Sequence, residues 1–142
     1  MKKKGSILIE VIASIMILTL TTTFIISTSI QNANILKKRI LLEEVNRSIG
    51  NLVNEFKYNM SEEEIEELLI NDKVGFMYDK DFSRRLFSTN IRELKKGSDI
   101  EVSKTGEDSI GIKLKIQANI KIEKNEINVE NEFTKSWWMD EI

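Results

Sequence analysis

The sequence contains no cysteine, no histidine and no proline. Without cysteine there can be no disulfide, thiolate zinc site or cysteine-linked lipid. Without histidine there can be no Ser-His-Asp triad and no histidine-ligated metal. The chain also lacks a Walker motif, a GxSxG motif and a glycine-rich phosphate loop. We therefore predict a protein that is not an enzyme and that uses no cofactor and no metal.

The chain also has no excess of basic residues. The 142 residues include 21 basic and 23 acidic side chains, for a net charge of −2. Such a chain creates no overall basic field that would draw it to nucleic acid. We expect about one domain and no direct contact with nucleic acid.

The charges that are present are distributed unevenly. Lys2, Lys3 and Lys4 stand at the N-terminus, and no charged residue occurs in the range 11–36. A membrane-spanning helix needs about 20 apolar residues. Basic residues before an apolar run favour a cytoplasmic N-terminus. The pattern predicts a single-pass membrane protein whose remaining, more acidic part lies outside the membrane.

Glu10 decides between three interpretations of this N-terminus. A secretory signal peptide would have a shorter apolar run and an A-x-A cleavage site. A plain signal anchor would leave Glu10 without a role. An acidic residue at the centre of a membrane helix costs about 2.5–3.5 kcal/mol. Although Glu10 stands near the cytoplasmic end, where the cost is lower, it indicates either a function that includes a partner for the carboxylate or a side chain that reaches the lipid headgroups.

The order of these residues resembles a known signal. Three lysines and Gly5 are followed by Ser6, then by Glu10 and an uninterrupted apolar helix. This resembles the class III signal of type IV prepilins and pseudopilins. The resemblance implies that a prepilin peptidase cuts between Gly5 and Ser6 and that the new amine of Ser6 is methylated. It also implies that Glu10 pairs with the N-terminal amine of a neighbouring subunit and sets the register of assembly.

The resemblance is closer to minor pilins and pseudopilins than to major pilins. Ser6 stands where phenylalanine is usual, and the proline and the disulfide-closed loop of many major pilins are absent. The expected partners are the prepilin peptidase, other pilin subunits, the membrane and the inner-membrane assembly platform. The expected destination is a surface pilus or a pseudopilus of a competence or type II secretion-like system. The alternative is a membrane-anchored extracellular binding module that is neither cleaved nor assembled.

An apolar stripe predicts that the N-terminal helix continues beyond the membrane. Its members recur at spacings of three, four and seven: Ile35, Leu42, Val45, Ile49, Leu52, Phe56 and Met60. We expect one helix over 6–59. The domain plan is then a leader at 1–5, a transmembrane or fibre-core helix at 6–30, and an extracytoplasmic head at 31–142. A separate coiled-coil segment is the alternative explanation of the stripe.

The second half of the sequence predicts an antiparallel sheet. Ser61 and Glu64 have the spacing of a capping box that opens a short helix. After residue 72 the apolar period falls to two, with strands expected at 74–78, 83–88, 99–104 and 110–122. A turn at Lys124 and Asn125 leads to a return strand. The predicted fold class is α+β, with a long N-terminal helix on a C-terminal antiparallel meander, as in type IV pilins.

A few further residues could have a chemical role. Trp137 and Trp138, on opposite faces of an extended chain, suggest one core residue and one contact with a neighbouring subunit. The other candidates are interpreted as solvated surface: Glu63, Glu66 and Glu67 as possible metal ligands; Asp72, Asp79 and Asp81 as a possible calcium loop; and Arg84 and Arg85, with Phe82 and Phe87, as a possible contact for single-stranded nucleic acid.

Overall fold

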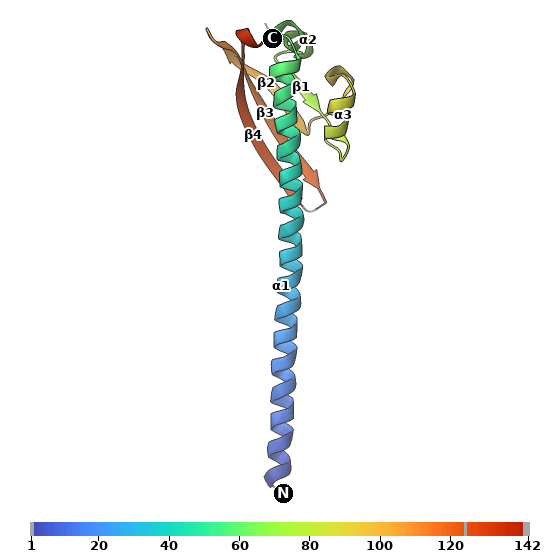
Figure 1. Cartoon of the computed structure of the whole chain (residues 1–142). Helices are drawn as coiled ribbons and strands as arrows, with labels where there is room; N and C mark the ends of the chain where they lie inside the picture. Colours follow the sequence, from blue (N-terminus) through green and yellow to red (C-terminus); the bar gives the residue numbers. More distant parts are fainter. Residues whose placement is uncertain (1, 124, 141–142) are drawn as a thin grey trace. The chain divides into compact units, whose positions relative to one another are not determined.

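The computed structural model describes residues 2–123 and 125–140, without the side chains of 2–4 and 140. The chain divides into two compact units, Met1–Leu41 and Leu42–Ile142. The first unit is entirely helical where it is described. The second contains a four-stranded sheet and several short helices (Figure 1). The fold class is therefore α+β, as predicted.

Helix α1 runs from Lys2 to Asn54 and continues into a π-helical turn, Glu55–Asn59. Met60 is extended and ends the helical path. The expected end of the long helix, at residue 59, is confirmed. No proline interrupts it, and the single interior glycine of its later part, Gly50, is tolerated.

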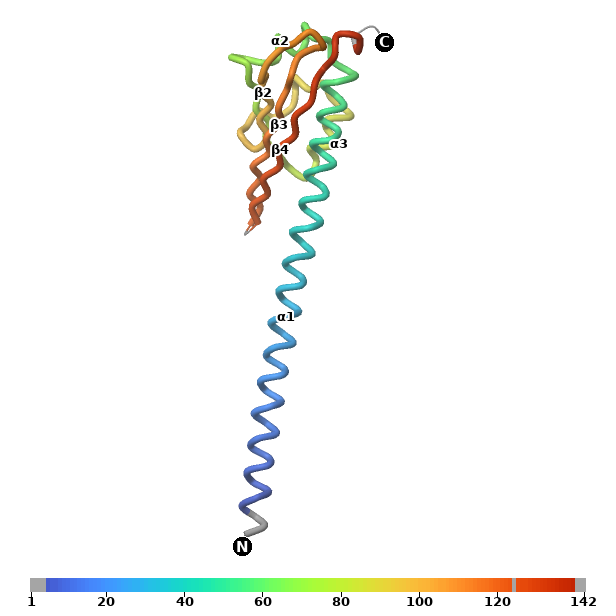
Figure 2. Tube along the Cα trace, turned by 90° about the vertical axis from the view of Figure 1, so that its left-hand side faces the viewer, coloured from blue at the N-terminus to red at the C-terminus, as the bar shows by residue number. Residues whose placement is uncertain are grey.

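The sheet is an antiparallel meander in the order β1-β2-β3-β4. Its strands are Lys73–Phe76, Ile100–Glu107, Gly111–Ile122 and Asn125–Ser136. Strands β3 and β4 pair without interruption from Gly111↔Ser136 to Ile122↔Asn125, and Figure 2 shows them running side by side. The predicted strands at 74–78, 99–104 and 110–122 are confirmed within a few residues of their ends.

The short helix after residue 60 is confirmed as α2, Glu62–Leu68. The Ser61 hydroxyl accepts a hydrogen bond from the Glu64 backbone, and the Glu64 carboxylate accepts one from the Ser61 backbone at 2.9 Å. This is the capping box that the sequence predicts. Its acidic first turn also suits the positive end of the helix dipole.

The predicted strand at 83–88 is wrong, because this segment forms helix α3, Phe82–Ser88. Phe82 and Leu86 are buried, one helical turn apart, while Phe87 is 74% exposed. An alternating strand would instead have buried every second residue. Between α3 and β2 lies one short 3₁₀ turn, Ile91–Glu93.

The core lies between the later part of α1 and one face of the sheet. Val45, Ile49, Leu52 and Phe56 are each no more than 1% exposed. The Phe56 ring stands 6.5 Å from that of Phe133 on β4, centroid to centroid. The sheet contributes the alternating residues Val102, Ile112, Leu114, Ile116, Ala118 and Ile120. The amphipathic stripe predicted for α1 is thus buried from Val45 onward, whereas Ile35 is 58% and Leu42 38% exposed.

Two details at strand ends differ from the expected alternation. Ile110 is 58% exposed because it lies in the turn before β3, where the Asp108 carboxylate accepts from its backbone N–H at 2.9 Å. Asn125 already belongs to β4, so its predicted place in the turn is wrong. Glu123 has a φ of 54°, and Lys124 lies outside the described residues.

Candidate functional site: the exposed N-terminal helix

The first unit presents apolar side chains on all sides of α1. Every residue from 5 to 40 is exposed, and none of the large aliphatic ones packs on another part of that unit. The exposed set is Ile7, Leu8, Ile9, Val11, Ile12, Ile15, Met16, Ile17, Leu18, Leu20, Phe24, Ile25, Ile26, Ile30, Ile35, Leu36 and Ile40. A helix that is apolar all round is stable only when something apolar surrounds it. By length and composition it could cross a membrane.

The hydroxyl groups of this helix are compatible with apolar surroundings. Ser14 donates to the backbone carbonyl of Glu10 at 2.7 Å, and Thr23 donates to that of Thr19 at 2.8 Å. Thr19, Thr21 and Thr28 make similar bonds to carbonyls three or four residues earlier. These hydroxyls therefore need no water, and small side chains permit close approach of a second helix.

Glu10 lies one helical turn after Ser6, on the same side of α1. Its carboxylate has no hydrogen-bond or ion-pair partner among the side chains that the structure describes; those of Lys2, Lys3 and Lys4 lie outside that set. An isolated carboxylate in a low-dielectric region is costly. A partner from outside the described residues would remove that cost.

Gly5 is not required by local packing. A Cβ atom built at Gly5 meets nothing within 4 Å, in contrast to Gly111, where it would collide with the carbonyl oxygen of Lys135 across the β3–β4 hairpin. The helical backbone at Gly5 accepts any ordinary residue. The fold therefore gives no packing reason for glycine at position 5, as it gives none for Gly50.

The two tryptophans are placed differently from the prediction. Both belong to a 3₁₀ turn, Trp137–Asp140, that follows β4, and not to a strand. Trp137 is half-buried, and its backbone N–H donates to the carbonyl of Ile110 at 3.1 Å. Trp138 is 58% exposed. Trp137 is therefore not a fully buried core residue, while Trp138 remains available to a neighbour.

The acidic and basic candidates of the head pair with one another. Arg85 bonds Asp79, and Arg84 lies 3.2 Å from Asp81. The hydrogen bond from Arg85 holds the pKa of the Asp79 carboxyl below its ordinary value. Because Arg84 and Arg85 lie on a helix and bind acids, the strand geometry considered for them is wrong.

The remaining acidic candidates are spread over α2 and a turn. Glu66 forms an ion pair with Lys104 at 3.1 Å, and Glu67 forms one with Arg92 at 2.7 Å. Asp72 occupies the turn before β1 with a φ of 62°. Nowhere in the described part of the chain do three acidic side chains come together in a metal-binding arrangement.

Two polar contacts that the sequence did not reveal hold the end of α1 to the head. Ser48, 1% exposed, shares a hydrogen bond of 2.7 Å with Ser83 of α3. Lys135, 2% exposed, donates from Nζ to the carbonyl of Lys57 at 2.8 Å. A cation at a helix C-terminus satisfies carbonyls that the helix leaves open. Lys135 falls on an inward position in the alternating pattern of β4, and this position is the sequence signal that could have predicted its burial.

Comparison with known proteins adds no assignment. No family model, no curated protein and no solved structure matches the chain. Functional inference therefore rests on the residues and their geometry.

Proposed function

We propose that this protein is a minor pilin or pseudopilin, a structural subunit of a type IV pilus, competence or type II secretion-like fibre. It is inserted through α1 with its N-terminus in the cytoplasm and cut between Gly5 and Ser6. It then assembles through packing of the exposed helix against those of other subunits. The head lies outside the cytoplasm and, after assembly, at the cell surface.

The observation that carries the proposal is the position of Glu10 at the start of a fully exposed apolar helix. A membrane alone would satisfy the aliphatic side chains but not the carboxylate. Cutting after Gly5 creates a cationic amine four residues before Glu10, at nearly the same depth. Opposite charges in a low-dielectric region attract strongly. Pairing Glu10 with the amine of a neighbouring subunit satisfies both groups and fixes the axial register.

Two further features support this function. Gly5 has no packing role in the fold, which agrees with selection by a processing enzyme. Within residues 14–28, serine and threonine hydroxyls bond to backbone carbonyls of the same helix, so these polar groups need no outside partner. Both suit a helix that first lies in lipid and later packs against other helices.

The substitution Glu10→Ala tests the role of the carboxylate. We expect normal membrane insertion, because the change makes the helix more apolar, and a drop of about tenfold or more in the sheared surface fraction. Loss of one pairing worth about 1.4 kcal/mol is enough for a factor of ten. The measurement is immunoblotting of membrane and sheared fractions from the native host.

Glu43→Ala is the matched control, because it removes an exposed carboxylate from the same helix outside the apolar run. It should assemble normally. Normal incorporation of the Glu10→Ala protein would contradict the role given to Glu10. An uncut leader in the wild-type protein would favour the anchored binding module instead.

A further inference from the structure

The two edge strands of the sheet, β1 and β4, differ in whether another segment covers their open side. The open side of β1 is covered by residues 95–97: Met77 donates to the Lys95 carbonyl at 2.9 Å, and Gly97 donates to the Gly75 carbonyl at 3.3 Å. A bridge joins Phe76 to Lys96 on the same side. No described segment pairs with the other side of β4, which is the outermost strand at the left of the sheet in Figure 1.

The register identifies the backbone groups that β4 leaves open. Trp137 donates to Ile110, and Asn119 donates to Asp99. In a regular antiparallel ladder, the backbone N–H and C=O groups of successive residues point alternately to one neighbour and to the other. The backbone groups of the odd-numbered residues of β4 therefore point toward β3, and those of the even-numbered residues point outward. The outward residues are Glu126, Asn128, Glu130, Glu132 and Thr134. Their N–H and C=O groups make no bond to another described segment.

The open edge is long and has neither a bulge nor a proline. The pairing of β3 with β4 has no bulge, whereas that of β2 with β3 shifts between Lys104 and Gly106. The chain has no proline to block an edge. Short edges, bulges and prolines are the usual protections against strand addition. Here the protection that remains is charge.

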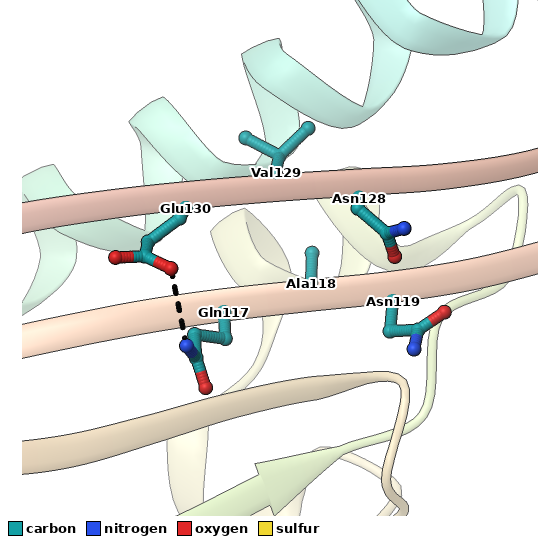
Figure 3. Close-up of a pocket in the computed structure, with 6 residues that line it drawn as sticks. All are labelled: Gln117, Ala118, Asn119, Asn128, Val129 and Glu130. Carbon is teal, nitrogen blue, oxygen red and sulfur yellow. Dashed lines mark hydrogen bonds between the residues drawn. The ribbon is translucent and has the colours of Figure 1, made fainter.

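The side chains along this edge are mainly acidic. Glu126, Glu130 and Glu132 share the solvent-facing side of β4 and are all exposed. Glu126 and Glu130 lie 3.3 Å and 2.7 Å from lysines of β3, but Glu132 is 3.9 Å from its nearest. Figure 3 shows Glu130 and Asn128 on one side of the sheet and Val129 on the other. An added strand would thus meet glutamates on one face and, on the opposite face, Ile127, Val129 and Phe133 with Asn131 among them.

A second copy of the chain is a poor occupant of this edge. Two β4 strands paired antiparallel about a centre anywhere from Asn128 to Glu132 place one glutamate of the solvent-facing side directly against another. Like charges directly opposite each other destabilise a strand pair. Opposite charges at the same positions stabilise it, so the edge favours a strand that carries lysine or arginine.

We propose that β4 is a docking edge for an extended segment of a different protein, added as a fifth strand. The segment carries basic side chains on one face and apolar side chains on the other. Strand β3 already meets these requirements on the opposite side of β4, with Lys113, Lys115 and Lys121 on its solvent-facing side. Backbone hydrogen bonds supply the affinity, and the glutamates select the partner. This inference does not depend on leader cleavage or on assembly through α1.

The test uses the full-length protein in detergent micelles and a synthetic peptide with the sequence of residues 111–122. Hydrogen exchange is followed at the outward amides of Glu126, Asn128, Glu130 and Glu132. We expect the peptide to protect these amides, with an affinity that falls as salt is added. A control peptide in which the three lysines are replaced by glutamate should give no protection.

Two variants locate the binding. Asn128→Pro removes an outward N–H without removing a bond to β3 and should weaken binding about fivefold, since each lost hydrogen bond is worth about 1 kcal/mol. Glu132→Lys should weaken it as well. Glu93→Lys makes the same charge change away from the edge and should bind normally. If the peptide instead displaced β3 and paired with that side of β4, its binding would not depend on the Asn128 N–H, because this group points away from β3.

Three results would overturn the proposal. They are absence of amide protection by the basic peptide, equal protection by the glutamate peptide, and unchanged binding to a folded Asn128→Pro protein. A β4-to-β4 homodimer detected by cross-linking would likewise replace the heterologous partner by a second copy. Thermal unfolding of each variant confirms that the sheet is intact.

Discussion

The two parts of α1 differ in the pattern of their residues and in how far these residues are buried. From residue 5 to residue 40 the helix buries nothing, while Val45, Ile49, Leu52 and Phe56 are almost completely buried. The difference is in the pattern: apolar residues surround the first part and form a single stripe on the second. A stripe can be covered by one sheet, but an all-round apolar surface requires a membrane or several helices.

The largest expected effect compares two phenylalanines of these regions. Phe56 is fully buried against Phe133, and Phe24 is 73% exposed. Phe56→Ala should lower the free energy of unfolding of the head by about 3–5 kcal/mol, because it removes buried area and leaves a cavity. Phe24→Ala should leave it unchanged. Denaturant unfolding in detergent, monitored by tryptophan fluorescence, measures both.

A loss of stability in the Phe24→Ala protein equal to that of Phe56→Ala would contradict the comparison. It would mean that the Phe24 side chain contributes to folding as a buried residue does, against its exposure of 73%.

Two glycines give the next effect. Gly111→Ala should cost about 1–3 kcal/mol of unfolding free energy, because the added methyl group meets the Lys135 carbonyl across the hairpin. Gly5→Ala should cost nothing, since the space around Gly5 is open. Thermal unfolding of the two variants in the same detergent provides the measurement. Equal melting temperatures for both would show that the hairpin can absorb the methyl group.

The smallest effect is a pH dependence confined to the head. The hydrogen bond from Arg85 lowers the folded-state pKa of Asp79. The unfolded chain releases this proton near the ordinary value of about 3.9, so the stabilisation is complete above that pH and is lost as the pH falls through the lower folded value. For a partly exposed pair it amounts to about 1 kcal/mol or less.

Asp79→Asn should therefore reduce the loss of stability between about pH 5 and pH 2 and should be destabilising at neutral pH. Unfolding curves at several pH values measure this. An identical acid dependence in the variant and the parent would assign it to other carboxylates, such as Asp108, whose pKa is lowered by the hydrogen bond from Lys113.

Periodicity predicted most of the fold. The long helix, the capping box of α2 and the hairpin of β3 and β4 each have a local pattern of many residues, or a specific pair, that permits one structure. The segment of α3 was mistaken for a strand because seven residues contain only two inward positions, Phe82 and Leu86. So short a pattern does not separate a period of 3.6 from a period of two.

The candidate site was predictable only in its local parts. Gly5, Ser6 and Glu10 are recognisable from spacing, and the exposure of the surrounding helix follows from its composition. Contacts between distant segments, such as that of Lys135 with the Lys57 carbonyl, depend on tertiary packing. The open edge of β4 depends on which strands neighbour it, and this order has no sign in a single segment.

The central claim is that the chain is processed for assembly, and the mass of its N-terminus tests it most directly. The protein should be purified from its native membrane or from the sheared surface fraction. We predict a chain that begins at Ser6, with or without a methyl group on its amine. A chain that begins at Met1 or Lys2 would contradict it and would leave a membrane-anchored protein whose Glu10 has no assigned partner.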